Sequence, residues 1–188
     1  MRKASYNDKD TVVEILSTSF IDDPHVNWLI EESKNKNKLK ILIEYVFGES
    51  LDRGEIYLSD DNKAAVLWNT EKKGKVSFEF IKRNLQFLFQ VGLKSTIRAL
   101  KTDKIIYNLY PKKQPYCQLY LIGVLPDGQG KGLASSLMNP MIESMKTRAI
   151  PMHLETANPR NVEIYKKKGF SVINTMQFGK NTLYWMRR

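Results

Sequence analysis

The sequence has few of the features that mark secreted or membrane proteins. Cys117 is the only cysteine among 188 residues, which excludes an internal disulfide and suits a reducing, cytoplasmic setting. The first ten residues, MRKASYNDKD, contain no apolar segment of the kind found in a signal peptide. No run of about 18 apolar residues occurs that could span a membrane. We therefore expect a cytoplasmic protein with no membrane partner.

Internal repeats, low-complexity stretches and linkers rich in proline, glycine or serine are also absent. A chain of 188 residues is long enough to bury one substantial core, so we expect residues 1–188 to form a single domain. The apolar fraction of 42% and the aromatic fraction of 11% are typical of a folded protein.

Basic residues are in excess, and the formal net charge is +10. Such a charge raises the possibility of nucleic acid or another anion as a partner. The lysines and arginines are scattered along the chain, however, and no RNA-binding or zinc-finger motif accompanies them. We expect solvated basic surfaces and no nucleic-acid partner. No group of His, Cys and Asp residues has the spacing of metal ligands, so no metal site is expected.

Apolar spacing predicts helices in the first half of the chain. One helix should follow Asn7 and Asp8 and end before Pro24, and a second should cover 39–51 and end at Gly54. Residues 55–59 and 64–69 are typical of a β-hairpin. Helical spacing returns over 78–108, with a break expected at Gly92.

The second half alternates strands and helices. Strands are expected at 116–124, 152–157, 170–173 and 182–186. A helix should follow the glycine-rich loop and bend at Pro140. Another should begin after Asn158 with Pro159 in its first turn and end at Gly169. This order predicts an α/β fold with a mixed sheet.

The stretch VLPDGQGKGLA (124–134) joins a strand to a helix. It is not a Walker A loop, because Gly132 follows Lys131 where Ser or Thr is required, and it lacks the third glycine of a Rossmann fingerprint. Gly128, Gly130 and Gly132 would let backbone N–H groups converge beside a helix N-terminus, an arrangement that suits a pyrophosphate. A simple strand–helix turn is the alternative.

A second motif lies downstream, where Asn158, Tyr165 and Gly169-Phe170 follow the loop pattern Gln129-x-x-Gly132-x-Ala134. Together these motifs resemble those of the GNAT superfamily of acyl-CoA-dependent N-acetyltransferases. The segments VLPDGQGKGLASSLMNP and LETANPRNVEIYKKKGF look similar to its puromycin N-acetyltransferase branch. The resemblance implies a mixed, largely antiparallel central sheet flanked by helices. It also implies that the sheet is splayed at an acyl-CoA cleft between strands 118–124 and 152–157.

The resemblance further implies which residues bind acetyl-CoA. The pantetheine arm would pair with the backbone at Ile122–Val124, where Gly123 is typical of a bulge or of a close backbone approach. The pyrophosphate would lie on the loop. The full set of expected coenzyme A contacts is Ile122, Gly123, Val124, Gln129, Gly130, Lys131, Gly132, Leu133, Ala134, Ser135, Asn158, Asn161 and Tyr165.

The implied chemistry is attack of a neutral amine on a thioester, which requires a base because an alkyl ammonium has a pKa near 10. Tyr165 occupies the family's acid position. Glu155 is the candidate base, unless Arg160 or His153 merely holds its carboxylate. His25 and Asp23 are alternative bases. Relatives often have histidine where this chain has Gln118, which cannot act as a base.

The resulting hypothesis is an acetyltransferase acting on a primary amine of a small molecule. Two alternatives remain: an enzyme acting on protein N-termini or lysines, and a non-catalytic acyl-CoA sensor. The net positive charge weakly disfavours polyamine acceptors, unless the local charge of the pocket outweighs it. The sequence does not indicate an oligomeric state.

Overall fold

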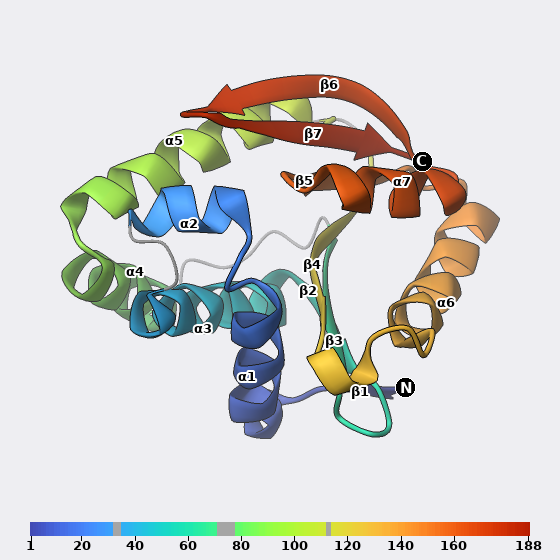
Figure 1. Ribbon diagram of the computed structural model, residues 1–188, viewed down its shortest axis with the longest axis horizontal. Coiled ribbons are helices and arrows are strands. Elements are labelled where there is room, and N and C mark those ends of the chain that lie inside the picture. Colours follow the sequence, from blue (N-terminus) through green and yellow to red (C-terminus); the bar gives the residue numbers. More distant parts are fainter. Residues whose placement is uncertain (32–34, 71–77, 112–113) are drawn as a thin grey trace.

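A seven-stranded sheet lies between two layers of helices in the computed structural model, which describes residues 1–31, 35–70, 78–111 and 114–188 (Figure 1). The strand order is β1-β2-β3-β4-β5-β7-β6, and every described neighbouring pair is antiparallel except β4 and β5. The strands are β1 (Arg2–Lys3), β2 (Gly54–Leu58), β3 (Ala64–Thr70), β4 (Cys117–Val124), β5 (Met152–Thr156), β6 (Ser171–Phe178) and β7 (Asn181–Arg187). This is the mixed, largely antiparallel sheet that the resemblance implies.

Helices cover both faces of the sheet. Figure 1 shows α1 to α5 on one side and α6 on the other. The α-helices are α1 (Lys9–Ser19), α2 (Pro24–Ile30), α3 (Lys36–Arg53), α4 (Phe78–Val91), α5 (Leu93–Leu109), α6 (Leu133–Thr147) and α7 (Pro159–Lys167). Two 3-10 turns, Tyr6–Asp8 and Pro126–Gly128, precede α1 and the glycine loop.

Strand β3 shows how one sequence serves both layers. Ala64, Val66 and Trp68 belong to the core under α6 and α7, whereas Ala65 and Leu67 belong to the core under α1 and α3. Successive side chains of a strand point to opposite faces, so a fully apolar strand buries both. All five of these residues are completely buried.

The sheet is splayed between β4 and β5. These parallel strands pair only at their beginnings, through Cys117↔Met152, Gln118↔His153 and Leu119↔Leu154. Beyond Leu119, β4 keeps its pairing with β3 up to Val124, but no described strand pairs with its other edge. The expected opening between these two strands is confirmed.

A β-bulge lies at the point where the two strands part. Leu67 of β3 pairs with Leu121 and Trp68 pairs with Leu119, so Tyr120 is the extra residue of β4. Consequently Tyr120 and Leu121 both pack against the core under α1 and α3. A bulge of this kind redirects a side chain without ending the strand.

Gly123, which we considered a marker of a bulge or of a close backbone approach, is not at the bulge and pairs in register with Ala65. The close approach is that of helix α1 to the backbone of the strand. A Cβ at this position would lie 2.6 Å from Oγ and 2.8 Å from Cβ of Ser19. The Ser19 hydroxyl also donates to the carbonyl of Val124 at 3.2 Å.

Gly123→Ala is therefore expected to destabilise the protein by about 1–3 kcal/mol through overpacking against Ser19. Adding Ser19→Gly, which removes both clashing atoms, should recover part of this loss. Urea unfolding of the two single variants and the double variant measures the coupling. Strictly additive effects would contradict the close approach as the reason for the glycine.

Most sequence-based elements are confirmed, including the hairpin and the break at Gly92 between α4 and α5. The prediction missed α2, although Asp23 before Pro24 is a typical helix start. It also missed β1, and the strand expected at 170–173 continues as β6 to Phe178. Helix α6 passes through Pro140 as one element.

Candidate active site

A cavity of about 390 Å³ lies on the α1–α5 side of the sheet, where β4 and β5 separate. Its lining includes four of the expected site residues: Ile122, Glu155, Asn161 and Tyr165. The remaining walls come mainly from apolar side chains of α2, α3, α4 and α5. Strand β4 contributes Tyr120 and Leu121, which the bulge turns to this side.

Glu155 of β5 is fixed by two hydrogen bonds at the splay. The hydroxyl of Tyr110, which follows α5, donates to Oε1 at 2.5 Å, and Nε2 of Gln118 donates to Oε2 at 2.9 Å. Both bonds favour the charged carboxylate, but desolvation is the larger effect and raises the pKa of Glu155 to about 7. A carboxylate with this pKa in a cavity is suited to accept a proton near neutral pH.

The residues that hold Glu155 differ from those considered from the sequence. Neither Arg160 nor His153 bonds to it; Tyr110 and Gln118 do. His153 is instead buried beside the site and stacks on Trp185, with ring centroids 5.5 Å apart. Neither of its ring nitrogens has a hydrogen-bond partner in the described part of the chain, and burial lowers its pKa to about 4. Gln118 thus positions the carboxylate.

Asp23 and His25, the alternative bases, line the same cavity but have other roles. Asp23 caps α2, because its Oδ1 accepts the backbone N–H groups of His25 and Val26 at 3.0 and 2.9 Å. The ring of His25 packs against Trp28 and Phe178. Burial lowers its pKa to about 4, so it is neutral at pH 7. The Asp23 carboxylate is thus engaged in the helix cap and His25 is a weak base, whereas Glu155 has a pKa of about 7.

Tyr165 of α7 reaches the cavity from the other side of the splay. Its ring is buried and packs edge-on against Phe170. Burial raises the pKa of its phenol above the usual value, so the hydroxyl keeps its proton at neutral pH. It is therefore suited to donate a proton or a hydrogen bond.

The glycine loop lies at the far end of β4, outside this cavity. Gly130 and Gly132 have positive φ angles of 76° and 79°, a conformation that other residues rarely adopt. The first backbone hydrogen bond into α6 is Ser136 N–H to Gly132 O. Within the described residues, the N–H groups of residues 130–135 donate to no acceptor. Free N–H groups at a helix N-terminus are typical of an anion site.

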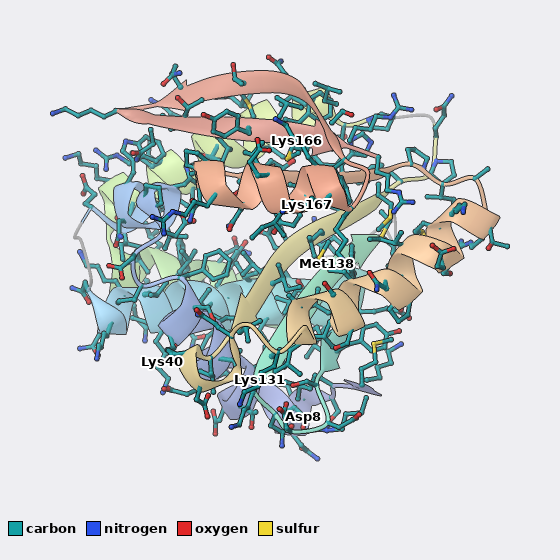
Figure 2. All side chains as sticks on the ribbon, turned by 45° about the vertical axis from the view of Figure 1, so that its right-hand side comes forward. Asp8, Lys40, Lys131, Met138, Lys166 and Lys167 are labelled. Carbon is teal, nitrogen blue, oxygen red and sulfur yellow. The ribbon has the colours of Figure 1, made fainter. Side chains whose placement is uncertain are left out.

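The side chains of the loop take different positions. Lys131 is exposed at the N-terminal end of α6 (Figure 2). Gln129 turns back and donates to the carbonyl of Val124 at 3.3 Å, so its amide stabilises the loop. Asp127 pairs with Lys63 at 2.6 Å and fixes the loop to the β2–β3 turn.

Asn158 and Asn161 begin α7. Oδ1 of Asn158 accepts the N–H of Arg160 at 3.0 Å, which confirms the capping role. Asn161 lines the cavity. The expected residues therefore form two groups, one at the cavity and one at the glycine loop, joined by residues 122–124 of β4.

The sequence did not identify Tyr110, Tyr120 or Asp103, all of which contact Glu155 or the cavity. Tyr110 is 45 residues from Glu155. No local pattern gives such a contact.

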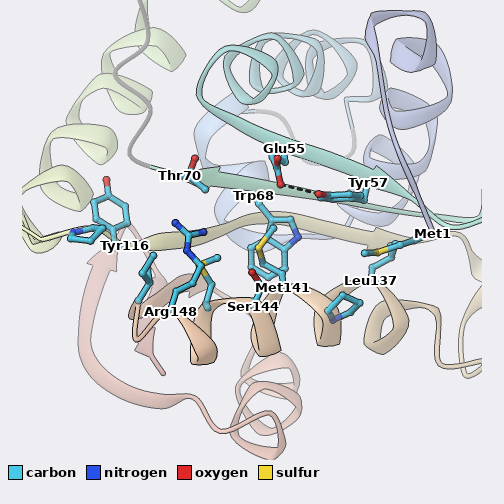
Figure 3. A pocket seen from close by; sticks show the side chains of 14 residues that line it. Met1, Glu55, Tyr57, Trp68, Thr70, Tyr116, Leu137, Met141, Ser144 and Arg148 are labelled. Atoms are coloured by element: carbon cyan, nitrogen blue, oxygen red, sulfur yellow. Dashed lines mark hydrogen bonds between the residues drawn. The ribbon is translucent and has the colours of Figure 1, made fainter.

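A separate groove of about 550 Å³ lies on the opposite side, between α6 and strands β2 and β3. Figure 3 shows Met141, Ser144 and Arg148 of α6 on the helix side of the groove, with Met141 beside Trp68. On the strand side, the hydroxyl of Tyr57 donates to Glu55 at 2.8 Å. None of the expected site residues lines this groove.

The fold and the site define an α/β protein whose central sheet opens between two parallel strands, with a cavity at the opening and a glycine loop beyond it. Residues 85–170 match the model of the acetyltransferase (GNAT) family. The matched region contains β4, the glycine loop, β5 and α7.

Two solved structures share this fold over the whole chain. A Corynebacterium glutamicum protein called histone acetyltransferase HPA2 and related acetyltransferase is 18% identical, with a TM-score of 0.67, and the match covers 99% of this chain and 93% of that one. Arylalkylamine N-acetyltransferase 2 from Aedes aegypti is 17% identical, with a TM-score of 0.66, and the coverage is 100% and 96%. At these identities the similarity concerns the fold alone.

A curated relative matches a shorter region. The mycothiol acetyltransferase of Propionibacterium freudenreichii subsp. shermanii is 38% identical over 65 residues, which is 33% of this chain. The match spans 21% of the length of that protein. In the described part of the chain no helix combines the length and apolarity needed to cross a membrane.

Proposed function

We propose that the protein is an acetyl-CoA-dependent N-acetyltransferase that acts on a primary amine of a small molecule. The observation that carries the proposal is the cavity at the splay, where a carboxylate with a pKa of about 7 and a protonated tyrosine line the same space. We assign this activity to residues 1–188 as one domain, because both cores pack on the same sheet.

The residues present fit acetyl-CoA. The free N–H groups of residues 130–135 and the Lys131 ammonium would hold the pyrophosphate. The unpaired edge of β4 at Ile122–Val124 would pair with the pantetheine amides, assisted by Asn161. When bound, acetyl-CoA supplies the thioester whose acetyl group is transferred.

Two residues of the chain then take part in proton transfer, one as the base and one as the acid. Glu155 accepts a proton from the acceptor ammonium, directly or through water, and Tyr110 and Gln118 hold its carboxylate in place. Tyr165 provides a protonated hydroxyl for the departing sulfur. The apolar walls exclude water from the reacting groups.

The cavity supports a small cationic acceptor with apolar parts. Among the described residues that line it, three are carboxylates (Asp23, Asp103 and Glu155) and none is lysine or arginine. The net charge of +10 weakly disfavoured polyamine acceptors, but the negative charge of the cavity itself favours a cationic acceptor. Side chains of helices α2 to α5 line the cavity and restrict the space for an acceptor, which favours a small molecule over a protein N-terminus.

A thiol-release assay with acetyl-CoA against a panel of amines tests the proposal. Because the sequence resembles the puromycin N-acetyltransferase branch, the panel includes aminonucleosides, together with arylalkylamines, diamines and short peptides. Turnover of peptides only would favour the protein-acetylating alternative. Coenzyme A binding without any turnover would favour a sensor, and no calorimetric binding of coenzyme A would refute all three functions.

Tyr165→Phe should lower kcat by roughly 10- to 100-fold, because general acid catalysis contributes on this scale or above. The coenzyme A affinity should change little, since the ring packing on Phe170 is kept. Steady-state kinetics and calorimetry on the same samples separate the two effects. Unchanged turnover would remove Tyr165 from the mechanism.

A further inference from the structure

The acceptor cavity has a second polar end, formed by α5 and the bulge of β4. Asp103 and Thr102 of α5 and Tyr120 of β4 line it. The carboxylate of Asp103 has an exposed surface and forms no ion pair or hydrogen bond within the described residues. Desolvation, with a smaller effect from the negative charge of Glu49, raises the pKa of Asp103 to about 6, so its carboxylate is mostly charged at pH 7.

Thr102 gives an independent sign that this end binds a ligand. Its side chain is only 4% exposed, and its hydroxyl has no hydrogen-bond partner in the part of the chain that the structure describes. A buried hydroxyl without a partner is unfavourable unless a ligand or water satisfies it. Ligand atoms in the cavity would meet this hydroxyl beside the Asp103 carboxylate.

Tyr120 of β4 lines the same cavity as both carboxylates. The negative charges of both Asp103 and Glu155 raise the pKa of its phenol, although burial is the larger cause. Asp103 belongs to α5 and Glu155 to β5, and Tyr110, which bonds to Glu155, follows Asp103 by seven residues. The carboxylate of Asp23 caps α2. The cavity therefore has two further carboxylates on different elements, Glu155 at the splay and Asp103 on α5, within mainly apolar walls.

We propose that Asp103, with Thr102 and Tyr120, binds a second positively charged nitrogen of the acceptor, remote from the amine that is acetylated. The acceptor is then a diamine or an amine with another cationic group, joined by an apolar spacer. This inference rests on the proposed function and adds the substrate class. Charge and hydrogen-bond donors on the remote group match an unpaired carboxylate and a hydroxyl that has no partner.

The test compares α,ω-diaminoalkanes with monoamines of equal chain length. We expect the wild-type protein to prefer the diamines, and Asp103→Asn to lower kcat/KM for them by roughly 10- to 100-fold. The monoamines should be almost unaffected, and Asp103→Glu should retain part of the preference. Asp10→Asn removes the same charge from an exposed position on α1 and should leave both acceptors unchanged.

An equal loss for diamines and monoamines, or no loss at all, would overturn the role of Asp103 while the acetyltransferase function remains. Absence of turnover with every amine would instead refute the proposed function. In that case calorimetry of a diaminoalkane, with coenzyme A present, still tests the subsite. Equal affinity of the wild type and Asp103→Asn would refute it, and weaker binding by the variant would support it.

Discussion

Replacing Glu155 by glutamine is expected to lower kcat by about 10²- to 10⁴-fold, the range that general base catalysis contributes. The fold should be retained, because glutamine has the same shape and Tyr110 can still donate to its amide oxygen. Gln118 can turn its own amide to present oxygen to the new NH₂ group. In the wild type, kcat/KM should rise with pH through an apparent pKa near 7, as Glu155 becomes charged.

The free energy of unfolding of the same variant, relative to that of the wild type, should increase as the pH rises. The pKa of Glu155 is about 7 in the folded protein against an ordinary value of 4.5. The folded state therefore holds this proton more tightly than the unfolded state, so the contribution is fully present below pH 4.5 and is lost as the pH rises through 7. Glu155→Gln avoids the loss, so its advantage over the wild type should grow by roughly 1–3 kcal/mol between pH 5 and pH 8.

Urea unfolding at both pH values, with kinetics on the same preparations, measures these effects. Glu163→Gln on the exposed side of α7 is a matched control that should change neither rate nor pH dependence. A variant that loses stability at pH 8, or keeps the wild-type rate, would remove Glu155 as the base.

Gly130→Val should weaken coenzyme A binding by roughly 10- to 100-fold, the cost of losing one or two charge-assisted hydrogen bonds. A β-branched residue is strained at a φ of 76° and would reorient the neighbouring N–H groups. A Cβ at this position meets nothing within 4 Å, so the rest of the fold should be undisturbed.

Gly92→Val provides the matched control for this effect. Gly92 has a φ of 96° and equally open surroundings, but it lies between α4 and α5. Both variants should lose about 1–3 kcal/mol of stability from backbone strain, while only Gly130→Val loses affinity in calorimetry. Equal affinities for the two variants would contradict an anion site at the loop.

Local signals predicted the parts of the fold that depend on local chemistry. Apolar spacing located α3, and Asn158 with Pro159 gave the start of α7. The opening of the sheet followed from the family resemblance, since no residue in β4 or β5 encodes it alone. The same spacing could not show that β6 extends to Phe178, because its side chains are mostly exposed.

The candidate site was only partly predictable. Glu155 was identified, but its partner Tyr110 comes from a distant helix end. No local pattern distinguished Asp103 from the other charged residues of its helix. The bulge at Tyr120 arises from pairing with β3, so the sequence of β4 could not place it. Contacts between residues far apart in the sequence therefore determine which side chains line the cavity.

Helix α5 bears on the length of the acceptor. Asp103 lies within this helix, and Tyr110, which holds the base, follows its last residue. The two positions are about two turns apart, or roughly 10 Å along a rigid axis. The helix thus fixes the distance between Asp103, which would bind the remote cationic group, and Tyr110, which holds the base Glu155. In the diaminoalkane series we expect a single optimal chain length, with activity falling for both shorter and longer acceptors.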